Sequence, residues 1–189
     1  MNSYRLSLFA IALIFIPLLV LSIIFYKERA FAFDAAYQLF DIIQTQSFAI
    51  QGTRFGAIFF QFPSWLFSQF TPDLNNIGMI YSTSGVLLPA LVTFLIWKMK
   101  YFELVGVALL FPIIFLGHSF YWAHSELFQS CYWAVLSIAL LFSSHKSKVY
   151  QILFAVSLIV TIFLHPVAPI LVGYGIGFLF LRGDLDARK

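Results

Sequence analysis

A hydrophobic run near the amino end, residues 6–26, most constrains what this chain can fold into. Its 21 residues match the roughly 20 that an α-helix needs to cross the hydrocarbon core of a bilayer. They exceed the roughly 7–15 apolar residues of a signal peptide, and no small-x-small cleavage site follows them. We therefore interpret this run as a retained membrane anchor.

Five further hydrophobic runs follow, at residues 77–97, 101–117, 127–143, 149–164 and 167–181. Hydrophobic residues make up 61% of the chain, well above the roughly 45–50% of soluble domains. We predict an all-α, polytopic helical membrane protein with about six transmembrane helices in one domain, residues 1–189. Gly173 and Gly177 form a GxxxG pattern in the last run, which predicts close helix packing there.

The distribution of basic residues predicts the orientation of these spans. If Arg5 is cytoplasmic, six crossings place eight of the 11 Lys and Arg residues on that side, as the positive-inside rule favours. The eight are Arg5, Lys98, Lys100, Lys146, Lys148, Arg182, Arg188 and Lys189. Both termini are then cytoplasmic, and most acid-base residues face outward. The formal charge of +3 is small and scattered, which argues against a nucleic-acid partner.

The largest segment between spans, residues 28–76, is predicted to be an outer-side loop that holds amphipathic interfacial helices. Its first half places Tyr37 and Phe40 at helical spacing, with Gln38 and Asp41 toward another face. We expect this helix to begin near Asp34 and to rest its aromatic face on the spans. The second half, GTRFGAIFFQFPSWLFSQFTPD, predicts a second interfacial helix or a re-entrant segment.

The layout of one span, a long outer loop that opens with an aspartate, and then short-looped spans resembles the N-terminal half of GT-C class glycosyltransferases. The runs FDAAYQLFDIIQTQSFAIQGTRFGAIFFQFPSWL and GHSFYWAHSELFQ are also similar to a poorly characterised group of bacterial membrane proteins related to that class. The resemblance implies the bacterial cytoplasmic membrane as the location. Members of that class usually continue into further spans and an outer-side domain, so the resemblance implies that the chain is a fragment of a longer protein, a minimal relative or one subunit.

For activity, the resemblance implies transfer of a sugar from a polyprenyl-phosphate-linked donor to an acceptor on the outer face. A carboxylate in such a site removes the acceptor's proton or holds a divalent cation, while a cation stabilises the departing phosphate. Asp34 matches the loop-start carboxylate and is the candidate catalytic residue. Arg54 is the candidate phosphate ligand, because a planar guanidinium suits phosphate oxygens. A divalent cation is the one cofactor implied, with no ligand assigned to it.

Further substrate contacts are expected from residues near the outer ends of the spans. They are His124, Glu126, Gln129 and His165. Each main candidate also has a purely structural explanation. Asp34 suits a helix N-cap, Arg54 can reach lipid headgroups, and Glu126 suits a helix N-terminus. His165 can simply lie at the membrane interface.

Two classes of function are compatible with these patterns. One is the glycosyltransferase, and the other is a non-catalytic membrane protein such as a lipid-carrier-binding subunit, a flippase-like transporter or an assembly scaffold. Transporters often carry polar residues or broken helices at mid-membrane depth. Here polar residues at that depth are mainly Ser82, Thr83 and Ser84, while ionisable residues crowd the outer ends. That distribution favours chemistry at the membrane surface.

Overall fold

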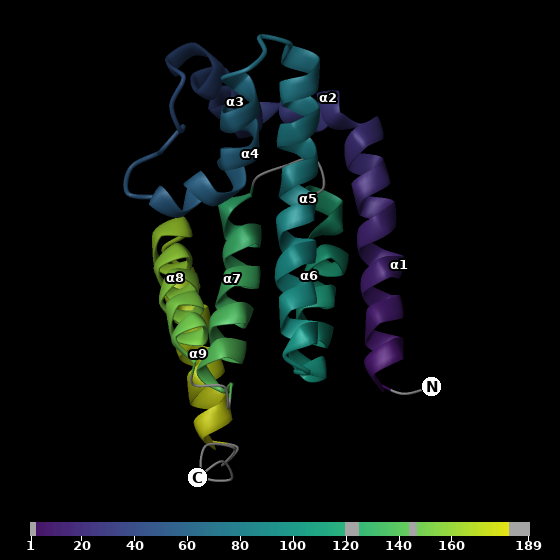
Figure 1. Ribbon diagram of the computed structural model, residues 1–189, viewed down its shortest axis with the longest axis vertical. Coiled ribbons are helices and arrows are strands. Elements are labelled where there is room, and N and C mark those ends of the chain that lie inside the picture. Colours follow the sequence, from purple (N-terminus) through teal and green to yellow (C-terminus); the bar gives the residue numbers. More distant parts are fainter. Residues whose placement is uncertain (1–2, 120–124, 144–146, 182–189) are drawn as a thin grey trace.

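The structure, a computed structural model, describes residues 3–119, 125–143 and 147–181. Within these residues the chain forms helices and no strands, which confirms the predicted all-α fold (Figure 1). The elements are α1 (Ser3–Ile24), α2 (Tyr26–Ala30), α3 (Phe33–Thr45), η1 (Phe55–Ala57), α4 (Ile58–Ser68), α5 (Leu74–Lys98), α6 (Phe102–Ser119), α7 (Glu126–Leu141), α8 (Lys148–Leu164) and α9 (Ala168–Leu181).

The six predicted spans correspond to α1 and α5–α9, which run lengthwise through the molecule (Figure 1). Among the described residues, α1 and α5 have the length and apolar composition of helices that cross a membrane. The described apolar stretches of α6, α7, α8 and α9 are shorter. Large apolar side chains of α1 lie exposed, including Phe9 and Leu13, both more than 60% accessible. Two membrane-length helices are thus present, while the full set of six crossings stays a prediction.

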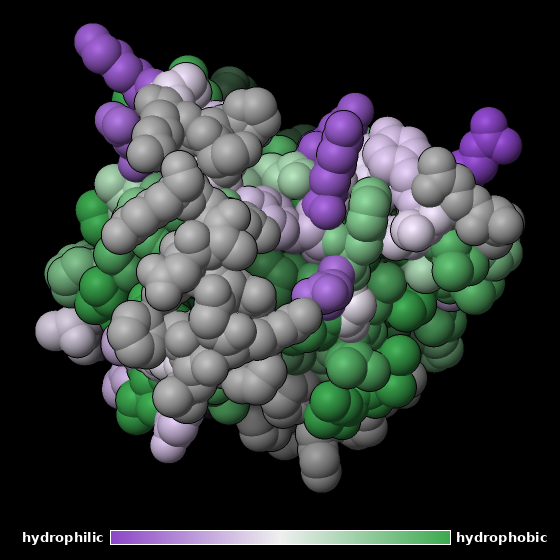
Figure 2. All heavy atoms as spheres, turned by 90° about the horizontal axis from the view of Figure 1, so that it is seen from below, coloured by the Kyte–Doolittle hydropathy of each residue, from purple (hydrophilic) through white to green (hydrophobic). Residues whose placement is uncertain are grey.

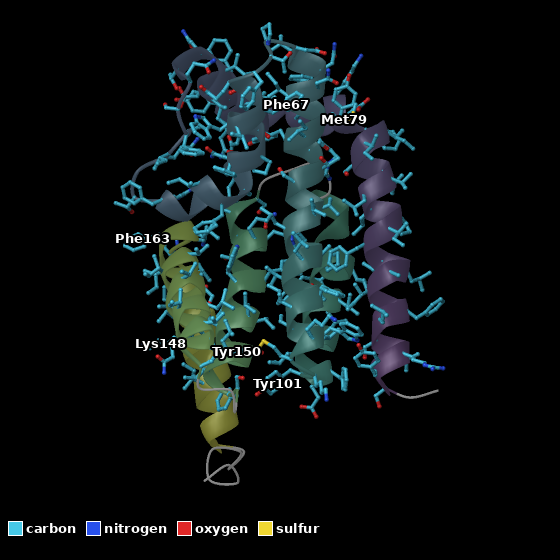
Figure 3. All side chains as sticks on the ribbon, viewed as in Figure 1. Phe67, Met79, Tyr101, Lys148, Tyr150 and Phe163 are labelled. Carbon is cyan, nitrogen blue, oxygen red and sulfur yellow. The ribbon has the colours of Figure 1, made fainter. Side chains whose placement is uncertain are left out.

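The two ends of this bundle differ. The first residues of α1 and the last described residues of α9 lie at one end, and α2, α3 and α4 cover the opposite end (Figure 1). Lys148 and Tyr101 lie toward the end where α1 begins, and Phe67 and Met79 lie at the other (Figure 3). In the view along the bundle from the end where α1 begins, single hydrophilic side chains project from the surface, and hydrophobic side chains cover much of the part that is drawn in colour (Figure 2). The segment 28–76 therefore forms a structured cover over one end of the helices.

The packed face of α3 differs from our expectation. Tyr37 and Phe40 are 60% and 62% exposed, so the prediction that the aromatic face rests on the spans is wrong. Instead Ala35, Leu39 and Ile42 are buried, at a spacing that also gives one helix face. These small and aliphatic side chains pack in one cluster with residues of α2 and α5, such as Ala30, Ile77 and Tyr81. Apolar residues occupy two sides of α3, and packing uses the aliphatic side.

A buried arginine of α2 is linked by hydrogen bonds to α5 and, through α5, to α1. The Arg29 Nε of α2 donates to Ser82 Oγ of α5 at 2.8 Å, and Ser82 Oγ donates to the Ser22 carbonyl of α1 at 2.7 Å. Burial lowers the pKa of Arg29 to about 10, so the guanidinium stays charged at neutral pH. This network fixes the chain where it turns from α1 into the cover.

The connection from α3 to α4 is held by side chains of α4. Gln61 is fully buried; its Oε1 accepts from the Ala49 N–H and its Nε2 donates to the Ala49 carbonyl, both at 2.9 Å. Trp65 Nε1 donates to the carbonyl of Gln46, the residue with positive φ that ends α3. The chain between α3 and η1 is therefore anchored although it has no regular structure.

Close contact between η1 and α8 fixes the far end of this connection. A Cβ added to Gly56 would lie 2.7 Å from Leu164 Cγ and 2.8 Å from the Val160 carbonyl oxygen, which is too close for real atoms. Only glycine permits this approach without a shift of the neighbours. Arg54, two residues earlier, is thereby placed beside the end of α8.

Candidate functional site

A cavity of about 420 Å³ opens between the cover and the end of the bundle. Its wall comes from the start of α3, the segment before η1, the start of α7 and the turn between α8 and α9. It is lined by Ala32, Asp34, Ala35, Gln38, Gln51, Arg54, Ser125, Glu126, Leu127 and His165. Four of the predicted site residues, which are far apart in sequence, thus face one space.

Asp34 lies in the first turn of α3 rather than at its cap. The N-cap is Ala32, and no side chain caps this helix end. Among the residues that the structure describes, the exposed Asp34 carboxylate has no hydrogen-bond partner. The capping explanation therefore does not account for Asp34, and its carboxylate is available to a ligand in the cavity.

Arg54 and Glu126 form an ion pair across the cavity wall. Arg54 Nη1 donates to Glu126 Oε2 at 2.5 Å, with the arginine side chain 41% exposed and the glutamate 7% exposed. The N-cap of α7 is Ser125, whose Oγ accepts from the Phe128 N–H, so Glu126 is not itself the cap. The positive end of the helix dipole and the guanidinium together stabilise this buried carboxylate.

His165 occupies the turn between α8 and α9. Its Nδ1 accepts from the Val167 N–H at 3.2 Å, so the imidazole carries its proton on Nε2. Partial burial, followed by the charge of Arg54, holds the pKa of His165 below its ordinary value. A neutral histidine thus lies beside a permanent cation.

The other two predicted substrate contacts are placed differently. Gln129 does not line the cavity; its Nε2 donates to the Gly85 carbonyl at 2.9 Å and ties α7 to α5. Gln129 lies about one turn after the start of α7, where its side chain is already between α7 and α5. Its hydrogen bond therefore stabilises the packing of these two helices. His124 lies outside the described residues.

Gln38 is a cavity residue that the sequence interpretation missed. The helical pattern predicts Gln38 on the same polar face as Asp41, yet Gln38 is only 4% exposed and lines the cavity. The Tyr81 hydroxyl donates to its Oε1 at 2.7 Å. The signal in the sequence was its position one helical turn after Asp34, which places both side chains on one face of α3.

A second cavity, of about 340 Å³, adjoins the first. It is lined by Gln51, Gly52, Thr53, Arg54, Ile162, Phe163, His165 and Pro166, so the two cavities share Gln51, Arg54 and His165. Phe163 projects at the outer edge of α8 (Figure 3). The second cavity therefore places a cation beside exposed apolar side chains.

The first cavity combines an unpaired carboxylate with an arginine and neutral amides, a set that suits proton abstraction next to a bound anion. The chain matches no protein-family model, no curated protein and no solved structure. Over the described part of the chain, no group of three or more His, Cys, Asp or Glu side chains is placed to hold a metal ion. Asp34 and Glu126 are the carboxylates that line the first cavity.

Proposed function

We propose that the chain is a membrane glycosyltransferase of GT-C type, or the N-terminal part of one, that uses a polyprenyl-phosphate-linked sugar. The observation that carries this proposal is the shared cavity of Asp34 and Arg54. It places a free carboxylate near a cation at the end of an apolar bundle. For a substrate whose lipid tail stays in the bilayer, the base and the phosphate ligand must both lie at the membrane surface.

The membrane arrangement belongs to the same proposal. Six helices cross the bacterial cytoplasmic membrane, with both termini in the cytoplasm and the cavity on the outer face. Support comes from the two membrane-length helices and the exposed apolar side chains of α1. Further support comes from the basic residues at the ends of helices opposite the cavity, Arg5, Lys98 and Lys148.

In the reaction, a hydroxyl oxygen of the acceptor attacks the anomeric carbon of the donor sugar. The bond from that carbon to the phosphate oxygen breaks, and its electron pair leaves with the polyprenyl phosphate. Asp34 takes the hydroxyl proton as general base, which raises the nucleophilicity of the oxygen as the new bond forms. Arg54 stabilises the charge that develops on the leaving phosphate. The proton on Asp34 then returns to water.

The second cavity suggests where the lipid phosphate lies. Arg54 uses one donor group for Glu126, and its planar fork has further N–H donors for phosphate oxygens. Exposed Ile162 and Phe163 next to this cavity provide an apolar path for the isoprenoid chain. Glu126 then has the role of holding the guanidinium in place.

The test compares Asp34→Asn with Asp41→Asn, two changes on the same helix, in membranes that contain the protein in its full-length context. Asparagine keeps the volume of aspartate and loses the base, so sugar transfer should fall at least about 100-fold for Asp34→Asn. Asp41 does not line the cavity, so its variant should retain the unmodified rate. Thermal unfolding must be similar for both.

Transfer at the unmodified rate by Asp34→Asn overturns the catalytic assignment. Binding of farnesyl phosphate by the unmodified protein, with no transfer under any donor and acceptor tested, supports the non-catalytic lipid-carrier-binding function instead.

A further inference from the structure

Gln38 is a buried polar side chain in the wall of the first cavity, and the proposed chemistry does not use it. It is 4% exposed, whereas a glutamine on the outer face of a surface helix is ordinarily solvated. A buried amide that lacks partners is costly, so such a group usually has a defined role.

Tyr81 determines how the Gln38 amide is oriented. The tyrosine is fully buried on α5, and its hydroxyl donates to Gln38 Oε1 at 2.7 Å. The NH₂ group is the opposite end of the same planar amide. Within the described part of the chain, Gln38 Nε2 has no hydrogen-bond partner. The cavity therefore presents a fixed donor with two N–H groups to whatever occupies it.

Asp34 supplies the complementary acceptor. It lies four residues before Gln38 on α3, and residues at this spacing are neighbours on one helix face, about 5–6 Å apart at their Cβ atoms. Both side chains line the cavity. A carboxylate that only accepts and an amide that donates thus lie side by side, pointing at the same space.

We propose that this pair recognises an acceptor with two adjacent hydroxyl groups, that is, a saccharide rather than a protein side chain. One hydroxyl donates to Asp34, and the oxygen of its neighbour accepts from Gln38 Nε2. A serine or threonine side chain has one hydroxyl and leaves Gln38 without a partner. The inference rests on the proposed function, because the hydroxyl at Asp34 is the one that reacts.

The roles of the two residues behind this recognition differ. Gln38 contacts the acceptor, whereas Tyr81 is a positioning residue that acts through Gln38. The volume of about 420 Å³ lies within the roughly 300–1,000 Å³ of small-molecule sites, so a monosaccharide unit can enter beside the donor.

The test measures binding of methyl β-D-glucopyranoside and its 3-deoxy analogue to the purified full chain in lipid nanodiscs, by saturation-transfer NMR. The 3-deoxy compound keeps three hydroxyls but has no adjacent pair. The unmodified protein should bind the parent glycoside about three- to tenfold more tightly, the effect of one hydrogen bond. Gln38→Met, which keeps the side-chain length, should bind both compounds equally.

Tyr81→Phe should lose most of the same preference, because the amide is no longer held. Tyr132→Phe is the matched control: Tyr132 is also fully buried, and its hydroxyl has no partner among the described residues. That variant should keep the preference. An unmodified protein without preference, or a Gln38→Met protein that keeps it, overturns the inference.

Sugar transfer from a lipid-linked donor, assayed on the same preparations, separates this inference from the proposed function. Preference for adjacent hydroxyls without transfer contradicts only the enzyme activity. Transfer to an acceptor without any such preference contradicts only the recognition by Gln38. Equal loss of preference in Tyr81→Phe and Tyr132→Phe contradicts the positioning role of Tyr81.

Discussion

Arg54 and Glu126 pair across 72 residues of sequence and join the segment before η1 to the first residue of α7. The two partners are unequally exposed, at 41% for the arginine and 7% for the glutamate. Loss of one partner therefore does not have the same cost as loss of the other. Glu126 without Arg54 is a carboxylate in a poorly solvated place, whereas Arg54 without Glu126 can turn to water.

The first prediction concerns the stability of this pair. Arg54→Met should lower the free energy of unfolding by about 1–3 kcal/mol, and Glu126→Gln by less, because only the first leaves a buried carboxylate unpaired. Thermal unfolding in detergent measures both. Arg5→Met removes an exposed cation and is the control. A greater loss in Glu126→Gln than in Arg54→Met contradicts the interpretation.

The second prediction concerns pH. Burial and the charge of Arg54 lower the pKa of His165, so its imidazole is neutral at pH 7. A bound phosphodiester adds a negative charge and raises that pKa, so the complex binds more protons than the free protein. Affinity for farnesyl-phosphoryl-glucose should therefore rise roughly three- to tenfold as pH falls from 8 to 6.

The charged groups that share cavities with His165 are the guanidinium of Arg54 and the carboxylates of Asp34 and Glu126. His165→Gln removes the histidine contribution and leaves those carboxylates in place. The affinity of this variant for farnesyl-phosphoryl-glucose should change less between pH 8 and pH 6 than that of the unmodified protein. An unchanged pH dependence in this variant assigns the effect to another group.

The third prediction concerns Gly56. Gly56→Ala should destabilise the protein by about 1–3 kcal/mol, because the new Cβ forces η1 away from the backbone of α8. Gly106→Ala is the opposite case: no atom of the described residues lies within 4 Å of its added Cβ, and alanine favours a helix interior by up to about 1 kcal/mol. The two variants should shift the unfolding temperature in opposite directions. A shift of the same sign contradicts this account of the contact.

The fourth prediction tests the membrane arrangement. Phe70, which is 80% exposed, follows the end of α4, and exposed Ser147 is the N-cap of α8. These two helix ends lie at opposite ends of the molecule (Figure 1). Cysteines at these positions should react with an impermeant thiol reagent from opposite sides of the membrane. The native Cys131 is buried and serves as the unreactive background. Labelling of both positions from one side contradicts the six-span arrangement.

The sequence predicted the structure well where a pattern is compatible with only one arrangement of the chain. Long apolar runs placed α1 and α5, and charge patterns at helix ends brought Asp34, Arg54, Glu126 and His165 to one end of the bundle. Helices that run in alternating directions through a bundle bring loops that are distant in sequence to the same end, and these residues lie at such helix ends.

The sequence was ambiguous where packing chooses between faces. α3 has an aromatic and an aliphatic side, and only contacts with α2 and α5 show that Leu39 and Ile42 are the buried ones. The same contacts turn Gln38 toward Tyr81. Among the described residues, the expected close packing at Gly173 and Gly177 is not found, since no described atom lies within 4 Å of an added Cβ at either glycine; Gly175 faces Ile138 instead. A GxxxG pattern alone does not show which face of the helix packs against a neighbouring helix.

The bonds between Gln61 and Ala49 bear on how the cavity can change shape. They anchor the start of the segment that carries Arg54, and the contact of Gly56 with α8 anchors its end. This wall is therefore fixed at both ends. The facing wall is held as well, because the bond from Tyr81 to Gln38 and the buried side chains of Leu39 and Ile42 tie α3 to its neighbours. We therefore expect substrates to be selected by their fit to a cavity of nearly constant shape, with no closing movement of the cover on binding.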